Sequence, residues 1–227
     1  MNVVITGASR GIGLGFVHHY LAQGCNVWAC FRSDPGDLLA IDHPRLHIFC
    51  WDVSQVCLEA DLNKVGFPEE IGLLINNAGV YGPKSGNGQD LLGVTGQVME
   101  DVFDVNCIGP VLVVQRLLGR LERGSGVVAN VSSKMGSSSD NGSGGCYAYR
   151  AAKAALIIVS KSMAIDLAPK GIGVITLHPG WVRTDMTNNS GLISVEESVA
   201  GMTNVIASHA DYELGQFVAF DGKVIPF

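Results

Sequence analysis

The sequence predicts one α/β domain in which a parallel, doubly wound β-sheet carries helices on both faces. Short apolar segments alternate with longer helix-like segments along the chain, which is the pattern of parallel strands with crossover helices. The chain has 227 residues, is 47% hydrophobic and only 16% charged, and contains 29 glycines, as expected for a compact domain with many tight turns. No internal repeat divides it, so we expect a single domain over residues 1–227.

The amino-terminal quarter begins this alternation. Residues 2–6 form an apolar segment that runs into a glycine turn, and 14–23 follow with helical periodicity until a glycine ends the helix. Residues 26–31 and 45–51 are further apolar segments bounded by turn residues. The chain between them has room for at most a short helix, and a further helix is expected from Ser54.

The rest of the chain continues in the same way. Apolar strands are expected at 71–75, 127–132, 172–178 and 217–221. Helical periodicity is present in stretches of 96–122, at 149–168 and at 195–207. A Gly/Pro/Ser-rich loop at 81–89 is expected to be mobile and to lie at the mouth of a site.

A glycine-rich turn joins the first strand to the first helix. Its sequence, Thr6-Gly7-Ala8-Ser9-Arg10-Gly11-Ile12-Gly13, has the spacing G-x-x-x-G-x-G. Gly7 permits a tight turn, Gly11 lets a pyrophosphate approach the backbone N–H groups of the helix, and Gly13 permits close packing. A plain glycine turn is the alternative, but the strand–turn–helix context favours a dinucleotide site. The predicted contacts are Gly7, Ser9, Arg10, Gly11, Ile12 and Gly13.

The end of the second strand indicates which nicotinamide cofactor fits. An acidic side chain there would bind the ribose 2′-hydroxyl, whereas an arginine accommodates a 2′-phosphate. The strand ends with Phe31 and Arg32, and no carboxylate occurs before Asp34. Arg10 is a second cation for the phosphate, although both arginines could be ordinary surface residues. The pattern favours NADP(H) over NAD.

Polar residues follow the third and fourth strands. Asp52 and Val53 come after the third strand, where a carboxylate lies on the ligand edge of a parallel sheet and could bind an adenine amino group. A cap for the following helix is the alternative role of Asp52. The segment Asn76-Asn77-Ala78-Gly79 after the fourth strand indicates either a backbone path close to a ligand or an ordinary turn.

The segment Tyr149-Arg150-Ala151-Ala152-Lys153 carries the candidate catalytic chemistry. A tyrosine and a lysine four residues apart lie on one face of a helix, and the ammonium would lower the pKa of the phenol. Such a phenol can exchange a proton with an alcohol or carbonyl oxygen near neutral pH. Ser133 lies sixteen residues upstream of Tyr149. The alternative is a structural helix with a half-buried tyrosine and a lysine that reaches the surface.

Together these motifs resemble the short-chain dehydrogenase/reductase family over the whole chain. The matching segments are TGASRGIG at 6–13, NNAG at 76–79, Asn106 within VNCIGP, Ser133, YRAAK at 149–153 and HPGWVRTD at 178–185. The run at 132–156 and the final GQFVAFDGKVIPF are similar to the carbonyl-reductase branch that includes Sniffer and the bacterial C-factor proteins. The resemblance implies a Rossmann-type sheet and an NADP-linked oxidoreductase.

The resemblance also implies a role for each matching residue. Tyr149 would be the general acid in reduction, and Ser133 would hydrogen-bond the substrate oxygen. Lys153 would lower the pKa of the tyrosine and hold the ribose hydroxyls, and Asn106 would anchor a water of a proton relay. The nicotinamide end would be lined by Pro179, Gly180, Val182 and Thr184. The adenosine would be flanked by Asp52, Val53, Asn76, Ala78 and Gly79.

One spacing departs from the family pattern. The gap between Ser133 and Tyr149 is longer than usual, and the extra residues fall in the loop 137–145, which we expect to bulge outward. Ser132 and Tyr147 are rival assignments. Ser132 is disfavoured because the second serine of Ser-Ser-x-x-Gly matches the family, and Tyr147 because the residue four positions on is an alanine.

The composition narrows the classes of partner. A net charge of −6 without a Lys/Arg cluster argues against nucleic acid. No apolar segment has transmembrane length and the amino terminus has no signal-peptide features, so we expect no membrane association and a cytoplasmic location. The six cysteines show no metal-ligand spacing, so no metal is expected.

We therefore predict an NADPH-dependent reductase of small aldehydes, ketones or quinones. The short segment 186–195 predicts an open substrate pocket, with Trp181, Tyr81 and Tyr147 either as aromatic walls or as packing residues. The alternative is a C-factor-like signalling or interaction protein that binds a nucleotide and whose turnover is secondary. The family further implies a homo-oligomer, either a dimer or a tetramer.

Overall fold

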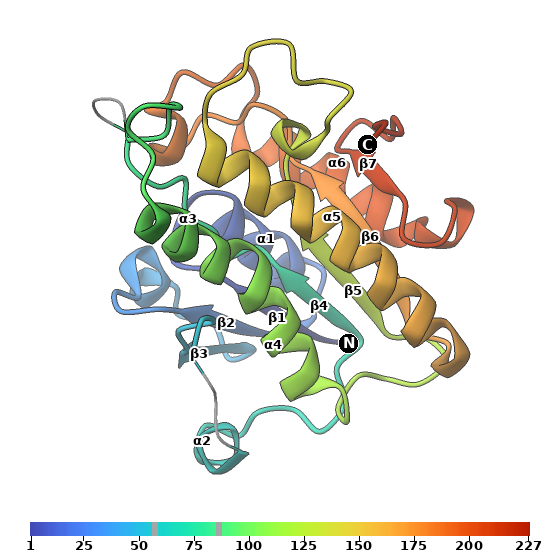
Figure 1. The fold of residues 1–227 in the computed structure, drawn as a ribbon. Coiled ribbons are helices and arrows are strands. Elements are labelled where there is room, and N and C mark those ends of the chain that lie inside the picture. Colours follow the sequence, from blue (N-terminus) through green and yellow to red (C-terminus); the bar gives the residue numbers. More distant parts are fainter. Residues whose placement is uncertain (56–58, 85–87) are drawn as a thin grey trace.

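A central β-sheet flanked by helices organises the chain (Figure 1), and the computed structural model describes residues 1–55, 59–84 and 88–227. Among these residues, seven strands pair in the order β3-β2-β1-β4-β5-β6-β7, and every pair is parallel. The strands are β1 Asn2–Thr6, β2 Asn26–Phe31, β3 Leu46–Cys50, β4 Leu73–Asn76, β5 Val127–Val131, β6 Gly173–His178 and β7 Phe217–Ala219. The predicted parallel, doubly wound sheet is therefore confirmed.

The direction of winding reverses between β1 and β4. From β1 the chain adds β2 and β3 on one side, and then returns to add β4 to β7 on the other. The loops that leave the carboxyl ends of β1 and β4 therefore diverge, and in open α/β sheets ligands bind in the crevice between such loops. The fold thus places the candidate site at this edge before any side chain is considered.

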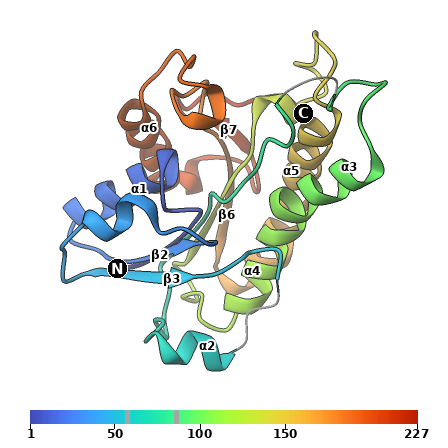
Figure 2. The same cartoon turned by 90° about the vertical axis from the view of Figure 1, so that its left-hand side faces the viewer.

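Helices cover both faces of the sheet (Figure 2). One face carries α1 Gly11–Ala22, which packs beside α6 Val195–Ala207. The other face carries α3 Gly96–Phe103, α4 Gly109–Leu117 and α5 Tyr147–Leu167. A further helix, α2 Glu59–Lys64, lies below the sheet in the view of Figure 1.

Short helical turns connect these elements. The 3-10 turns are Gly36–Ala40, Lys134–Gly136, Ala168–Lys170, Asp185–Thr187 and His209–Asp211, and Asp104–Ile108 is a π turn. No helix in the described part of the chain has the length and hydropathy of a membrane span.

The core consists of two apolar layers, one on each face of the sheet. Side chains alternate along β1, so that Val3 and Ile5 contact the layer under α1 and α6 while Val4 contacts the layer under α4 and α5. All three are fully buried. Because helices cover both faces, the strands are apolar along their whole length, which is why they are readily found in the sequence.

The first two helices depart from the prediction. Ser54, where a helix is expected to begin, lies in a turn; the described helix α2 is Glu59–Lys64, and residues 56–58 lie outside the described residues. The carboxylate of Asp52 accepts hydrogen bonds from the N–H and the hydroxyl of Ser54 at 3.0 and 2.8 Å, a local arrangement that competes with a helix. The first helix begins at Gly11 rather than at Leu14, because the last residues of the glycine turn already adopt helical geometry.

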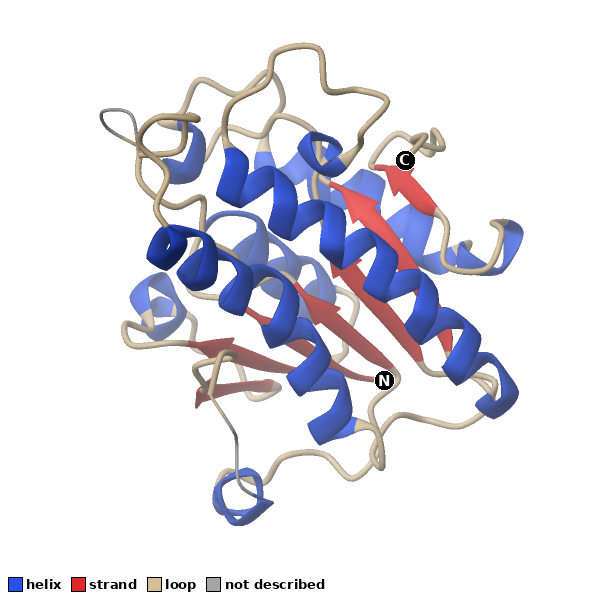
Figure 3. Ribbon diagram, viewed as in Figure 1, coloured by secondary structure: helices blue, strands red, loops and turns tan. Residues whose placement is uncertain are grey.

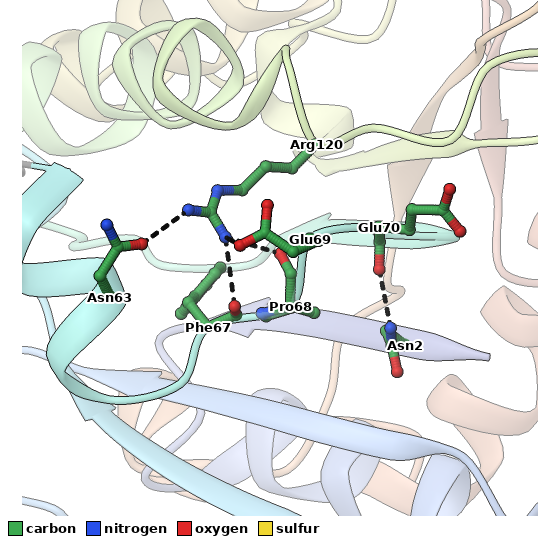
Figure 4. Close-up of polar contacts among 7 residues, drawn as sticks. All are labelled: Asn2, Asn63, Phe67, Pro68, Glu69, Glu70 and Arg120. Atoms are coloured by element: carbon green, nitrogen blue, oxygen red, sulfur yellow. Dashed lines mark hydrogen bonds and ion pairs between the residues drawn. The ribbon is translucent and has the colours of Figure 1, made fainter.

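A buried arginine fastens the loop before β4 at the opposite end of the sheet (Figure 4). Arg120 is 8% exposed. Its guanidinium donates to Phe67 O at 3.1 Å, Pro68 O at 2.9 Å and Glu69 Oε1 at 3.5 Å in that loop, and to Asn63 Oδ1 of α2 at 3.0 Å. Asn2 adds a hydrogen bond from its amide to Glu70 O at 2.8 Å. The contacts of Arg120 satisfy the buried carbonyl groups of Phe67 and Pro68, which would otherwise lack this donor.

Candidate active site

The carboxyl ends of the strands point to one side of the molecule (Figure 3) and bring the predicted site residues together there. The glycine turn follows β1, the Asn76–Gly79 segment closes β4, Ser133 follows β5 and the Pro179–Thr184 segment follows β6. These four segments are far apart in the sequence. Their meeting at one edge follows from the parallel arrangement of the strands.

The glycine turn is locked to the segment after β4. Gly7 has φ +63°, a conformation that favours glycine, and a Cβ at this position would lie 2.7 Å from Ala78 Cα. The hydroxyl of Thr6 accepts hydrogen bonds from the N–H groups of Asn77 and Ala78, each at 3.1 Å. Asn77 returns two hydrogen bonds from its amide to the carbonyls of Thr6 and Gly7. Backbone of both loops is thereby held in one rigid unit.

The amino terminus of α1 is arranged to receive an anion. Arg10 occupies the N-cap position of α1, but its side chain makes no capping hydrogen bond, and the first turn of the helix carries no acidic residue. In the described part of the chain, the first N–H groups of α1 therefore lack a capping side chain. Gly11 has φ +54°, and a Cβ there would lie 3.4 Å from Thr184 Cγ2. The segment after β6 therefore lies directly against the glycine turn. A helix amino terminus of this kind binds phosphate through its N–H groups and its dipole.

Both predicted phosphate-binding cations lie at this edge and are exposed. Arg10 forms an ion pair with Asp185 at 3.9 Å, and the two side chains are 77% and 71% exposed. Such a pair contributes at most about 1 kcal/mol, so Arg10 can exchange this partner for a phosphate at little cost. Arg32 is exposed immediately after β2.

Two predicted cofactor contacts use their side chains elsewhere. Val53 is 6% exposed and belongs to the apolar core. Asn76 is 2% exposed, and its amide donates to Asn130 Oδ1 at 2.8 Å. The backbone of each residue remains for contact with a ligand. Asp52 binds Ser54 within a turn, and its alternative role as a helix cap stays a prediction, because residues 56–58 lie outside the described residues.

Four predicted catalytic residues converge beneath this edge. The exposed fractions of Tyr149, Lys153, Ser133 and Asn106 are 8%, 4%, 8% and 0%. The hydroxyl of Ser133 lies close enough to the phenol of Tyr149 to lower its pKa. Lys153 Nζ lies 5.9 Å from the centroid of the Tyr149 ring and donates to Val131 O at 2.9 Å. The four side chains are thus in one cluster, although the ammonium contacts a backbone carbonyl rather than the phenol.

Asn106 lies in the π turn between α3 and α4, a type of distortion that is frequent at functional sites. Its amide forms two hydrogen bonds with the backbone of Val80, donating to the carbonyl at 2.7 Å and accepting from the N–H at 3.0 Å. A Cβ at Gly79 would lie 2.8 Å from Asn106 Oδ1 and 3.5 Å from Lys153 Nζ. Glycine at this position therefore leaves room for both groups. The water-anchoring role of Asn106 stays a prediction.

The geometry distinguishes the rival residues. The hydroxyl of Ser132 is 2% exposed and donates to Lys153 O at 2.9 Å, so it joins β5 to α5. Tyr147 is 41% exposed, whereas Tyr149 is buried beside Ser133. Residues 138–144 of the long loop are exposed, which agrees with the expected outward bulge. The extra loop residues therefore do not separate Ser133 from Tyr149.

The pKa of Tyr149 is raised to about 12, mainly because burial removes the phenolate from water. The Ser133 hydroxyl lowers this pKa and the nearby Cys146 raises it. Burial also lowers the pKa of Lys153 to about 8. The prediction that Lys153 lowers the pKa of Tyr149 is wrong for this structure, because the ammonium is held by Val131 O. At neutral pH the phenol is protonated.

Two neighbours of Tyr149 were given no catalytic role by sequence reasoning. The ring of Tyr81 lies 4.9 Å from that of Tyr149, measured between centroids. Gln89 is 7% exposed and accepts a hydrogen bond from the N–H of Tyr149 at 3.1 Å. Both belong to the loop 81–89, of which residues 85–87 lie outside the described residues. A lone glutamine at the end of a Gly/Pro/Ser-rich loop carries no signal of this contact.

Fold and site together define the class of the protein. A sequence model of the family described as short chain dehydrogenase matches residues 1–192. The chain therefore belongs to the short-chain dehydrogenase/reductase family of oxidoreductases. In the described part of the chain, no three His, Cys, Asp or Glu side chains gather in a way that could hold a metal ion.

Individual relatives agree with this assignment and with the expected branch. The C-signal of Myxococcus xanthus is 39% identical over 158 residues, which are 69% of this chain and 93% of that protein. The carbonyl reductase Sniffer of D. melanogaster superposes with a TM-score of 0.89 at 31% identity, and the match covers 100% of this chain and 99% of the Sniffer chain. An NADPH-bound carbonyl reductase from chicken fatty liver has a TM-score of 0.87 at 31% identity, with coverages of 100% and 98%.

Proposed function

We propose that the protein is an NADPH-dependent reductase that converts the carbonyl group of small aldehydes, ketones or quinones to an alcohol. The observation that carries this proposal is the buried phenol of Tyr149, whose pKa is raised by burial and lowered by the neighbouring Ser133 hydroxyl, at the sheet edge that the glycine turn also reaches. A protonated phenol beside a hydroxyl is suited to give a proton to a carbonyl oxygen. The likeness to carbonyl reductases supports the same class of substrate.

The residues at this edge fit a dinucleotide with an additional phosphate. The uncapped amino terminus of α1 and the left-handed glycines Gly7 and Gly11 suit a pyrophosphate. Arg10 and Arg32 are exposed cations suited to a 2′-phosphate, and Arg10 would lose only its weak ion pair with Asp185 on binding it. NADPH is bound in the chicken carbonyl reductase, and we infer the same cofactor here. When bound, it supplies the hydride.

Each residue of the cluster has a defined task in this proposal. Tyr149 donates a proton to the substrate oxygen, and Ser133 hydrogen-bonds that oxygen. Lys153, with a pKa lowered to about 8 by burial, can hold or release a proton near neutral pH and so return one to Tyr149. It would also bind the ribose hydroxyls. Asn106 keeps the backbone at Gly79 and Val80 in place through its paired hydrogen bonds.

The first prediction concerns Tyr149→Phe. NADPH oxidation is followed by absorbance with a panel of aldehydes, ketones and quinones, and NADH is run in parallel. The substitution removes the proton donor but keeps the ring, so kcat should fall by about 100-fold or more. Tyr147→Phe is the matched control on the exposed ring two residues earlier, and it should retain turnover.

The outcomes separate the parts of the proposal. Turnover that survives Tyr149→Phe would reject this tyrosine as the acid. A preference for NADH would reject the cofactor assignment that rests on Arg10 and Arg32. Failure of every carbonyl compound, with NADPH still bound, would reject the reductase function.

A second candidate function is a signalling role, favoured by the 39% identity to the C-signal of Myxococcus xanthus. In that case the protein would bind a nucleotide and a partner, and turnover would be secondary. The same Tyr149→Phe variant discriminates, because a biological activity that persists without the phenol does not depend on reduction. The complete catalytic cluster favours the enzyme.

We further propose that the chain forms a homodimer or homotetramer and works in the cytoplasm. Ile158 and Ile165 of α5 are 52% and 54% exposed, although apolar residues rarely remain on a free helical face in such numbers. Helices α4 and α5 both lie in front of the sheet in the view of Figure 1. This two-helix face is suited to pairing with a second copy about a two-fold axis.

A further inference from the structure

Helix α5 begins without a cap of its own. Cys146 precedes the helix with φ 52° and ψ 41°, a left-handed conformation that is unfavourable for a residue other than glycine, and its side chain makes no capping hydrogen bond. The first turn is buried, since Ala148 is 1% and Tyr149 is 8% exposed. The N–H groups of this turn therefore need partners from elsewhere in the chain.

Gln89 provides these partners from a loop that is remote in the sequence. Its backbone carbonyl accepts a hydrogen bond from the N–H of Tyr147 at 3.1 Å. Its side-chain Oε1 accepts one from the N–H of Tyr149 at 3.1 Å, across 60 residues of sequence. These are the first and third positions of the helix. Gln89 thus takes the place of the missing amino-terminal cap.

The other end of the same amide holds the loop that faces Tyr149. Gln89 Nε2 donates to Tyr81 O at 2.7 Å and to Pro83 O at 3.4 Å. Gly82, between them, has φ +88°, and a Cβ there would lie 3.3 Å from Nε2. The orientation of the amide is determined by its partners, because an N–H lies at one end and carbonyl oxygens lie at the other.

A second connection closes the arrangement. The ring of Tyr81 lies against that of Tyr149, with centroids 4.9 Å apart and planes tilted by 41°. The hydroxyl of Tyr81 lies 2.8 Å from Cys146 Sγ, at hydrogen-bond distance for this pair. Loop and helix are therefore connected at two places, once through Gln89 and once through Tyr81.

We propose that Gln89 is a positioning residue for Tyr149, which couples the placement of the catalytic phenol to that of the Tyr81 wall of the substrate pocket. The inference rests on the proposed reductase function. Its oxygen arm fixes the helical turn that carries Tyr149, and its nitrogen arm fixes the backbone that carries Tyr81. Displacement of a catalytic group by about 1 Å can reduce a rate 100-fold, so a buried amide that sets this geometry has kinetic consequences.

The two arms are separated by two substitutions. Gln89→Leu removes both arms at similar volume and should lower kcat at least about tenfold, with the Kd for NADPH unchanged within about twofold. Gln89→Glu keeps an oxygen for the N–H of Tyr149 but loses the donor to Tyr81 O. It should recover most of kcat while KM for the carbonyl substrate stays raised, because the Tyr81 loop is released. Gln97→Leu, at an exposed glutamine on α3, is the matched control and should behave as the parent.

A readout independent of turnover completes the test. Hydrogen exchange of a peptide from the start of α5 that includes the N–H of Tyr149 reports this contact. Gln89→Leu should speed the exchange of the Tyr149 N–H, which loses its side-chain acceptor, and Gln97→Leu should not. Unchanged exchange and a kcat within twofold of the parent would overturn the inference. A parallel fall of kcat, NADPH affinity and thermal stability would also overturn it, because it would indicate general unfolding. If the parent reduces no carbonyl compound, faster exchange still supports the capping role while the reductase function fails.

Discussion

Tyr149 and Lys153 lie one helical turn apart, yet their polar ends do not meet in this structure. The ammonium of Lys153 donates to Val131 O, and burial raises the pKa of Tyr149 to about 12. For the reduction direction this is favourable, because the acid must hold its proton at neutral pH until the substrate oxygen takes it. A cofactor whose ribose hydroxyls attract Lys153 would bring the ammonium away from Val131 O and lower the pKa of the phenol.

The imidazole of His178 leads to a prediction about how stability depends on pH. Its Nδ1 accepts a hydrogen bond from the N–H of Lys134 at 3.3 Å, directly after Ser133. The pKa of His178 is lowered to about 4, mainly by burial and also by the charge of Lys134, while Asp140 and Asp221 act to raise it. At neutral pH the imidazole is therefore uncharged and able to accept the hydrogen bond.

The sign of the resulting pH dependence follows from linkage. Between about pH 6.5 and pH 4 the unfolded chain binds a proton at His178 that the folded protein does not. The free energy of unfolding should therefore fall as the pH falls through this window, by about 3 kcal/mol in total. His178→Asn should reduce this slope, measured by denaturant unfolding at several pH values. His18→Asn, at an exposed position of α1, should retain it, and an equal slope in both variants would reject the assignment.

At the scale of elements, α5 is held to the sheet by polar contacts as well as by apolar packing. Asn130 of β5 donates to Ser160 Oγ at 2.8 Å, and Ser132 donates to Lys153 O at 2.9 Å. A Cβ at Gly136 would lie 2.6 Å from the backbone of α5, so the loop after β5 passes directly over the helix. The helix that carries Tyr149 is thereby fixed along its length, while Gln89 determines how its first turn begins.

The hydrogen bonds of Arg120 lead to a prediction about the end of the sheet opposite the candidate active site. Arg120→Met keeps an apolar stem but leaves the carbonyls of Phe67 and Pro68 without this donor. Buried carbonyls without partners are costly, so the free energy of unfolding should fall by roughly 2–4 kcal/mol. Arg123→Met, at an exposed position nearby, should change it by less than about 0.5 kcal/mol. Both are measured by denaturant unfolding.

Because the cluster lies away from the catalytic edge, Arg120→Met should leave kcat of the folded fraction close to that of the parent. A large loss of kcat with unchanged stability would contradict the structural role of this arginine. Its contacts with the loop before β4 serve to hold the sheet, whose opposite edge carries the chemistry.

At the scale of the whole molecule, the exposed isoleucines of α5 predict an assembly. Ile158 and Ile165 are seven residues apart and therefore lie on one face of the helix. The double substitution Ile158→Glu and Ile165→Glu should convert the oligomer to a monomer, because two charges per chain would be buried at the contact. Light scattering coupled to size exclusion measures the mass. Val65→Glu, at an exposed position after α2, should leave the mass unchanged, and a parent that is already monomeric would reject the assembly.

Much of the architecture was accessible from the sequence because its signals are local. Helices and strands follow from the spacing of apolar residues, and the glycine turn, the Asn76–Gly79 segment and the Tyr149–Lys153 pair are short patterns whose geometry depends on neighbouring residues. Parallel strands then require that these motifs meet at one edge. Family, fold and the members of the candidate site therefore needed no coordinates.

Tertiary structure decided what each of these side chains does. The sequence places Lys153 one turn from Tyr149, but the fold gives the ammonium to Val131 O and buries the phenol, which reverses the predicted shift of its pKa. Asn76 turns its amide toward Asn130, and Gln89 caps a helix 60 residues away. Burial and long-range hydrogen bonds depend on which segments meet in space, and no local pattern encodes that meeting. The spacing of residues along the chain determined which chemical groups the site contains. The packing of distant segments determined the protonation of these groups and their hydrogen-bond partners.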